Sequence, residues 1–245
     1  MLSSGLGIPA QDQMVRRGAR DIVYAQLRQL IVSGELEPGA CIAEKALAAR
    51  VGMSRTPLRE SIKALETQGF MTRLPNGRLM VASLSPRGLR DLYATRLAIE
   101  RLIVQSVVSE ATDGQIQETL DPIAASIRSA VEVAHPEARA FGERFHYALA
   151  EICPNRVAST ILWELKDRIA LYRKIGPDRS PGRRMQAAKD HLRIYELVRA
   201  RQASEAVELL EEHIRRSQEV TLGFIADTPL SSGETSHQPS GPTSL

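Results

Sequence analysis

Three of the five histidines in this 245-residue chain are spaced so that they could bind one metal ion. His191 lies 11 residues before Gln202 and His213 lies 11 residues after it. A helical hairpin that turns near Gln202 would therefore place both imidazoles at the same height on adjacent helices. His146 follows Phe145 in an apolar stretch and should face the interior of a bundle. Neutral imidazoles from three helices suit Zn²⁺, Ni²⁺ or a similar divalent metal, whereas the alternative at each position is a core histidine without a metal.

A second group of polar side chains lies at the start of a short helix that is predicted from Ser54 to about Gly69. Arg55 and Arg59 lie one turn apart on one face, and an arginine can bind guanine O6 and N7 with two hydrogen bonds. Ser54 and Thr56 can reach a phosphate or a base edge. The opposite face is apolar, with Leu58, Ile62 and Leu65. This division of polar and apolar faces predicts a recognition helix that enters the major groove of DNA.

The segments around this helix complete a winged helix-turn-helix. A preceding helix starts at Glu44 and Lys45 and ends at a turn at Gly52. Two short strands are predicted after the recognition helix, at Met71–Leu74 and Leu79–Ala82. The Asn-Gly pair between these strands favours a tight hairpin, because both residues tolerate positive φ angles.

Positive charge is concentrated in the same part of the chain. Residues 14–90 hold 13 Lys and Arg against 6 Asp and Glu, whereas residues 91–245 hold 19 against 22. Phosphate neutralisation requires this distribution, although a solvated basic face on an amphipathic helix pair is the alternative. Lys45 can meet the DNA backbone, Gly77 allows the wing to approach the minor groove, and Arg78 adds charge. The predicted DNA-binding residues are Lys45, Ser54, Arg55, Thr56, Arg59, Gly77 and Arg78.

The predicted fold is mostly α-helical and has two domains. The winged helix-turn-helix spans residues 14–83, with a first helix that ends at Gly34. An all-helical antiparallel bundle spans residues 86–225, and it begins at Pro86 with Ser85 as the helix cap. Apolar residues recur at helical spacing within 89–104, 116–127, 141–149, 161–171, 192–198 and 207–220, and Pro136 and Pro154 should bound the third of these helices. Residues 1–13 and 228–245 are expected to be disordered.

Composition narrows the class of protein. A hydrophobic content of 43% and a charged content of 25% are typical of a soluble globular chain. Neither a membrane span nor a secretory signal is predicted. Cys41 and Cys153 lie far apart, which favours a reducing cytoplasmic location. A homodimer is expected because helix-turn-helix proteins read paired half-sites.

The first domain resembles the N-terminal domain of GntR-type bacterial transcription regulators. The resemblance rests on Leu36-Glu37-Pro38-Gly39, on Leu47-Ala48-Ala49-Arg50-Val51-Gly52 and, most specifically, on Ser54-Arg55-Thr56-Pro57-Leu58-Arg59-Glu60. It implies that the predicted DNA-binding residues occupy operator-contacting positions on double-stranded DNA.

The second domain resembles the all-helical ligand-binding domain of the FadR subfamily, called FCD. Arg96-Leu97-Ala98-Ile99-Glu100 is similar to its Arg-x-x-x-Glu opening, and Phe145-His146 and Asp190-His191 are similar to later motifs. The resemblance implies that His146, His191 and His213 are metal ligands. Metal-binding members carry a carboxylate four residues before the first histidine, but here that position is Gly142, and the neighbouring Glu143 lies about 100° around the helix.

The subfamily also implies a small effector that carries a carboxylate, such as an organic or sugar acid. Arg96 is the candidate effector clamp, because guanidinium matches carboxylate geometry, although an intrahelical pair with Glu100 is equally consistent with the spacing. Arg168 and Arg173 are further candidates. The predicted function is a regulator, commonly a repressor, whose operator binding the effector controls. The alternatives are an architectural DNA-binding dimer and a metalloenzyme, although the chain lacks a His-Glu-x-x-His motif and a nucleophile elbow.

Overall fold

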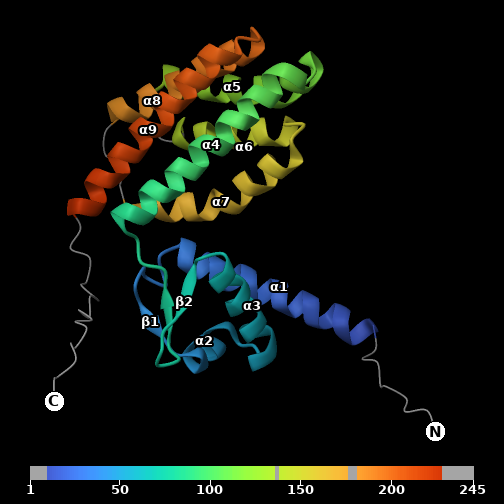
Figure 1. Ribbon diagram of the computed structural model, residues 1–245, viewed down its shortest axis with the longest axis vertical. Helices are drawn as coiled ribbons and strands as arrows, with labels where there is room; N and C mark the ends of the chain where they lie inside the picture. The colour runs from blue at the N-terminus through green and yellow to red at the C-terminus, as the bar shows by residue number, and fades with distance from the viewer. Residues whose placement is uncertain (1–9, 136–137, 176–180, 228–245) are drawn as a thin grey trace, which may run out of the picture.

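The computed structural model describes residues 10–135, 138–175 and 181–227. It consists of a smaller N-terminal region that holds a three-stranded sheet and a larger helical bundle, joined by a short segment that ends at Ser85 (Figure 1). The mostly α-helical, two-part fold predicted from the sequence is confirmed.

The N-terminal region is built from three helices: α1 (Ala10–Val32), α2 (Glu44–Val51) and α3 (Arg55–Thr67). Helix α1 packs along α3 and buries Val23, Leu27 and Ile31, whereas Ile22 is 52% exposed. Residues 10–13, which were expected to be disordered, belong to α1, and residues 1–9 lie outside the described part of the chain. The buried face of α3 is formed by Leu58, Ser61, Ile62 and Leu65.

The turn between α2 and α3 presents the start of the recognition helix. Gly52 ends α2 with a φ of 65°, a conformation that glycine adopts without steric cost. Ser54, where the recognition helix was predicted to begin, is the N-cap residue of α3 with extended backbone, but its side chain makes no capping hydrogen bond. The Ser54 hydroxyl therefore makes no hydrogen bond to the backbone at the start of the helix.

The wing is part of a three-stranded antiparallel sheet with the order β1-β3-β2. The strands are β1 (Cys41–Ile42), β2 (Met71–Arg73) and β3 (Leu79–Val81). Sequence analysis predicted the hairpin but missed β1, whose two residues pair with Met80 and Leu79. At the hairpin tip Gly77 has a φ of 77°, whereas Asn76 keeps a negative φ and accepts a hydrogen bond from the Arg78 backbone.

The bundle contains six helices within the described residues. They are α4 (Pro86–Glu110), α5 (Asp113–Glu132), α6 (Ala138–Ile152), α7 (Arg156–Ile175), α8 (Pro181–Arg199) and α9 (Ala203–Asp227). The predicted cap of α4 is confirmed, because the Ser85 hydroxyl accepts a hydrogen bond from Gly88 N at 3.0 Å. The expected start at Pro136 lies outside the described residues, and so does the expected disordered tail at 228–245.

Helix α4 crosses the bundle and packs against α6, α7 and α9, while α8 and α9 form an antiparallel hairpin. The chain reverses between Arg199 and Ala203, so the predicted turn near Gln202 is confirmed. Arg201 takes a φ of 58° there and donates to the carbonyl of Val108 at 3.0 Å, which satisfies the carboxyl end of α4. Among the described helices, none is both long and apolar enough to span a membrane.

Candidate functional site

Three imidazoles meet inside the bundle. His146 on α6, His191 on α8 and His213 on α9 are all buried, and one ring nitrogen of each lies within 4.8 Å of the others. The ring centroids of His191 and His213 are 4.4 Å apart, so their predicted equal height is confirmed. The Nε2 atoms of His146 and His191 are 3.0 Å apart. Because two nitrogens bound to one zinc ion at ~2.0–2.1 Å are separated by about 3.0–3.4 Å, these residues fit a divalent metal.

Two carboxylates orient the outer nitrogens of this centre. Glu100 Oε2 lies 2.5 Å from His146 Nδ1, and Asp190 Oδ2 lies 3.3 Å from His213 Nδ1. Burial opposes ionisation of Glu100, but Arg96 and His146 outweigh it and hold its pKa well below the usual value. An ionised carboxylate accepts the Nδ1–H, which leaves the Nε2 lone pair free to face a metal.

Sequence reasoning did not assign a histidine contact to either carboxylate. Glu100 was visible as part of the Arg-x-x-x-Glu motif, one helical turn from Arg96. Asp190 was visible only as the neighbour of His191, yet it binds His213 on the next helix. This contact depends on the register of α8 against α9, which no local pattern specifies.

Burial keeps the three imidazoles neutral at pH 7. Desolvation lowers the pKa of His146 to about 4, although Glu100 partly opposes the shift. Desolvation also lowers the pKa of His191 well below its usual value, and it lowers that of His213. A neutral imidazole is the protonation state that ligates metals.

Gly142 makes room for the ring of His191. A Cβ atom at position 142 would lie 2.5 Å from both Cε1 and Nδ1 of His191, so the imidazole fills the space that a carboxylate side chain would need. His191 Nδ1 is buried and has no hydrogen-bond partner. Glu143 does not replace the carboxylate, because its Oε1 accepts a hydrogen bond from Arg173 Nη1 at 2.6 Å.

A cavity of about 510 Å³ opens beside the three histidines. Its wall includes four arginines, Arg173, Arg183, Arg184 and Arg216. Arg216 Nη2 donates to Asp190 Oδ2 at 2.9 Å, which ties the cavity wall to the histidine centre. The wall also includes Glu143, Asp190 and Glu219, and its guanidinium groups are the part that could bind a small anion.

Arg96 does not line this cavity. Its side chain is 2% exposed and its Nε donates to Glu100 Oε1 at 2.5 Å, so the structure contains the intrahelical pair that sequence analysis held open. The two further candidates for effector binding, Arg168 and Arg173, lie in different places. Arg173 lies in the cavity wall, whereas the Arg168 guanidinium lies beside Gly69 of the N-terminal region.

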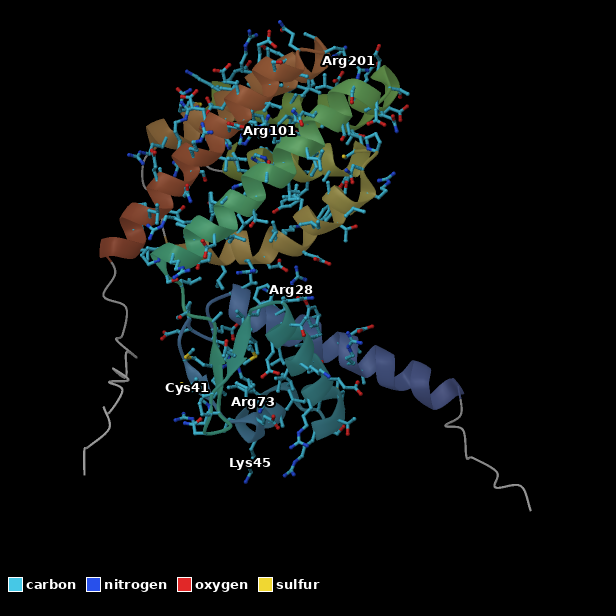
Figure 2. All side chains as sticks on the ribbon, viewed as in Figure 1. Arg28, Cys41, Lys45, Arg73, Arg101 and Arg201 are labelled. Carbon is cyan, nitrogen blue, oxygen red and sulfur yellow. The ribbon has the colours of Figure 1, made fainter. Side chains whose placement is uncertain are left out.

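The predicted DNA-binding residues lie together on the N-terminal region, and all seven are exposed. Figure 2 shows Lys45 at the end of the molecule farthest from the bundle, with its side chain pointing outward. Arg59 Nε lies 3.1 Å from Glu44 Oε2, and Arg78 Nη2 donates to the Cys41 carbonyl at 3.0 Å. Arg73, which sequence analysis did not select, adds an exposed cation beside them at the wing.

Replacing Gly142 with alanine should destabilise the bundle and weaken metal binding. The new Cβ must displace the His191 ring, because their separation would be only 2.5 Å. Gly223→Ala in α9 is the matched control, since nothing lies within 4 Å of its built Cβ and helical Gly→Ala changes commonly stabilise by up to about 1 kcal/mol. The unfolding temperature should fall in Gly142→Ala and rise in Gly223→Ala. Equal stabilisation of both would show that the His191 ring is not held against α6.

The metal-free protein should lose stability as pH falls from 7 to 4. The pKa of His146 is about 4 in the folded protein against an ordinary value of 6.5, so the unfolded chain binds more protons in this interval. Each such imidazole contributes a slope of up to about 1.4 kcal/mol per pH unit. The free energy of unfolding, measured with urea at several pH values, should depend less steeply on pH for His146→Gln than for the unsubstituted protein. Identical slopes would contradict the burial of a neutral imidazole at this position.

Two protein families match adjoining parts of the chain. Residues 19–81 match the family described as bacterial regulatory proteins, gntR family, and residues 91–216 match the FCD domain. The first match contains α2, α3 and the sheet, and the second contains all three histidines.

Similar proteins that align with most of this chain are also transcriptional regulators. The Nta operon transcriptional regulator of Aminobacter aminovorans is 30% identical over 80% of this chain and 91% of its own length. The HTH-type transcriptional regulator YdhC of Bacillus subtilis is 26% identical over 78% of this chain and 85% of its own. The solved structure of Escherichia coli McbR/YncC has the same fold, with a TM-score of 0.67 and 19% identity over 84% of this chain and 97% of that one. The protein therefore belongs to the GntR family, with FadR-like architecture, and is a DNA-binding transcriptional regulator with an effector-binding FCD domain rather than an enzyme.

Proposed function

We propose that this regulator is a cytoplasmic, homodimeric repressor that leaves its operator when a small organic or sugar acid binds beside a metal ion in the helical domain. The observation that carries the proposal is a cavity walled by arginines that opens on three buried histidines. A cavity of about 510 Å³ falls within the ~300–1,000 Å³ typical of small-molecule sites.

In this proposal the exposed residues of α3 read the operator. Arg55 and Arg59 bind base edges in the major groove, while Lys45, Ser54 and Thr56 bind phosphate or a base edge. Gly77 and Arg78 place the wing on the minor groove. All seven residues are exposed, which supports their contact with DNA.

The metal proposed for the centre is Zn²⁺ or Ni²⁺, held by His146, His191 and His213. Both ions accept neutral imidazole ligands. When bound, the metal supplies a Lewis-acid site for an oxygen of the effector. Glu100 and Asp190 orient the ligand nitrogens, and Arg96 keeps Glu100 ionised without contacting the effector.

The effector carboxylate is assigned to Arg173 and Arg216. Guanidinium groups bind carboxylates with two parallel hydrogen bonds, and these two side chains enter the cavity from α7 and α9. A purely architectural DNA-binding dimer has no evident use for arginines from three helices gathered around one cavity.

Helix α7 offers a route from the cavity to the DNA-binding region. Tyr172, next to Arg173, is buried, and its hydroxyl lies 3.4 Å from both the nitrogen and the oxygen of Ser85 in the joint between the two regions. On the same helix Asp167 pairs with Arg28 of α1, which Figure 2 shows at the boundary between the regions. A change in Arg173 on ligand binding would thus reach two contacts that set the position of the DNA-binding region.

Arg59→Ala tests the DNA assignment. Loss of a bidentate arginine–guanine contact costs about 1–3 kcal/mol, so operator affinity should fall roughly five-fold or more, and most of the loss should be specific to the operator. Arg50→Ala removes the same charge from the end of α2 and is the control. Fluorescence anisotropy on an operator fragment recovered by genomic selection gives both values. Equal losses in the two variants would mean that α3 is not the recognition helix.

Arg173→Gln tests the effector assignment. Hydroxy acids and sugar acids screened by thermal shift on metal-loaded protein should include some that raise the unfolding temperature of the unsubstituted protein. The same acids should have little effect on Arg173→Gln, because one of the carboxylate partners is missing. Arg193→Gln, an exposed arginine paired with Glu196 on α8, should respond normally. Unchanged responses in Arg173→Gln would remove Arg173 from the effector site.

Tyr172→Phe tests the route through α7. The variant loses only the hydroxyl at the Ser85 joint, so it should bind both operator and effector with nearly normal affinity when each is measured alone. The effector should, however, release it from the operator less effectively than it releases the unsubstituted protein. Operator titrations with and without the effector measure this coupling. Full coupling in Tyr172→Phe would exclude this contact from the route.

A further inference from the structure

One carboxylate pairs with an arginine that is proposed to contact DNA and with an arginine of the wing. Glu44, the first residue of α2, has a side chain that is 24% exposed, and both of its oxygens accept from arginines of other elements. Oε2 lies 3.1 Å from Arg59 Nε on α3, and Oε1 lies 2.9 Å from Arg73 Nη1 on β2. A negative charge here opposes phosphate binding, so its presence calls for a compensating role.

The contact with Arg59 selects which edge of the guanidinium is left for DNA. Glu44 engages Nε, and the two terminal nitrogens of Arg59 remain available to the O6 and N7 atoms of a guanine. The side chain of Arg59 is 65% exposed, so without a partner its long stem would populate several rotamers. Fixing the Nε edge reduces the ordering that binding otherwise requires.

The second contact extends the network to the wing. Arg73 Nε pairs with Glu66 Oε1 of α3 at 3.3 Å, and Arg73 Nη1 lies 3.4 Å from the carbonyl oxygen of Gly77 at the hairpin tip. Burial opposes ionisation of Glu44, but the hydrogen bonds from Arg59 and Arg73 hold its pKa below the usual value, so the carboxylate is charged when DNA is bound. One side chain thereby joins α2, α3 and the wing.

We infer that Glu44 is a positioning residue for operator recognition, which holds Arg59 for a guanine and, through Arg73, fixes the wing relative to the recognition helix. The inference rests on the proposed DNA-binding role of α3. It makes a distinctive claim, because Glu44 lowers affinity for any DNA through its charge and raises affinity for the operator through Arg59.

The test measures Glu44→Gln on two DNA fragments, an operator recovered by genomic selection and a scrambled sequence of the same length. Glutamine keeps the size of the side chain but loses the charge that fixes both arginines. Affinity for scrambled DNA should stay equal or rise, whereas the ratio of operator to scrambled affinity should fall about ten-fold. Glu60→Gln removes the same charge from an exposed position on α3 and should leave this ratio unchanged.

A double substitution separates positioning from a general structural effect. If Glu44 acts through Arg59, adding Glu44→Gln to Arg59→Ala should change the ratio much less than it does in the unsubstituted protein. An unchanged ratio in Glu44→Gln, or an equally large loss in both backgrounds, would overturn the inference. Circular dichroism and thermal unfolding of each variant establish that it is folded. Failure of the unsubstituted protein to prefer any fragment would instead contradict the proposed function.

Discussion

The helical domain is organised around ionisable groups that are buried and must therefore satisfy one another. Arg96 and Glu100 lie one turn apart on α4, are almost fully buried and pair with each other. The second oxygen of Glu100 pairs with His146. Removing one member of such a cluster leaves an uncompensated charge in the core, which is strongly destabilising. This requirement fixes α4 against α6 and orients one imidazole. His191 and His213 then approach from the α8–α9 hairpin, and Asp190 orients the second ring.

The cavity takes its properties from this centre. The helices that carry the histidines also carry part of the arginine wall, so a ligand that touches the cavity touches elements already tied to the core. Helix α7 belongs to this wall through Arg173 and is the bundle helix that lies nearest the DNA-binding region in Figure 1. Tyr172, the residue before Arg173, contacts Ser85 in the joint that precedes α4. In the proposed function, a ligand that displaces Arg173 would act on this joint through Tyr172.

Local patterns in the sequence were enough for much of this architecture. Apolar spacing and the turn at Gly52 placed the helix pair, and the equal distances from Gln202 brought His191 beside His213. What could not be predicted depends on packing between distant segments. The two-residue strand β1 pairs with β3 nearly forty residues later, and Glu44 reaches arginines on two other elements. The sequence identified Gly142 as the place of a missing carboxylate, but only packing shows that the His191 ring fills that space.

Calorimetric titration of Zn²⁺ into chelator-treated protein tests most directly whether the three buried histidines form one metal centre, as proposed. We expect saturation at one ion per chain for the unsubstituted protein. His191→Ala, which removes a single ligand and keeps Glu100 and Asp190 in place, should bind far more weakly and lose the accompanying rise in thermal stability. Binding of equal affinity and stoichiometry in His191→Ala, or no saturable binding in the unsubstituted protein, would contradict the account.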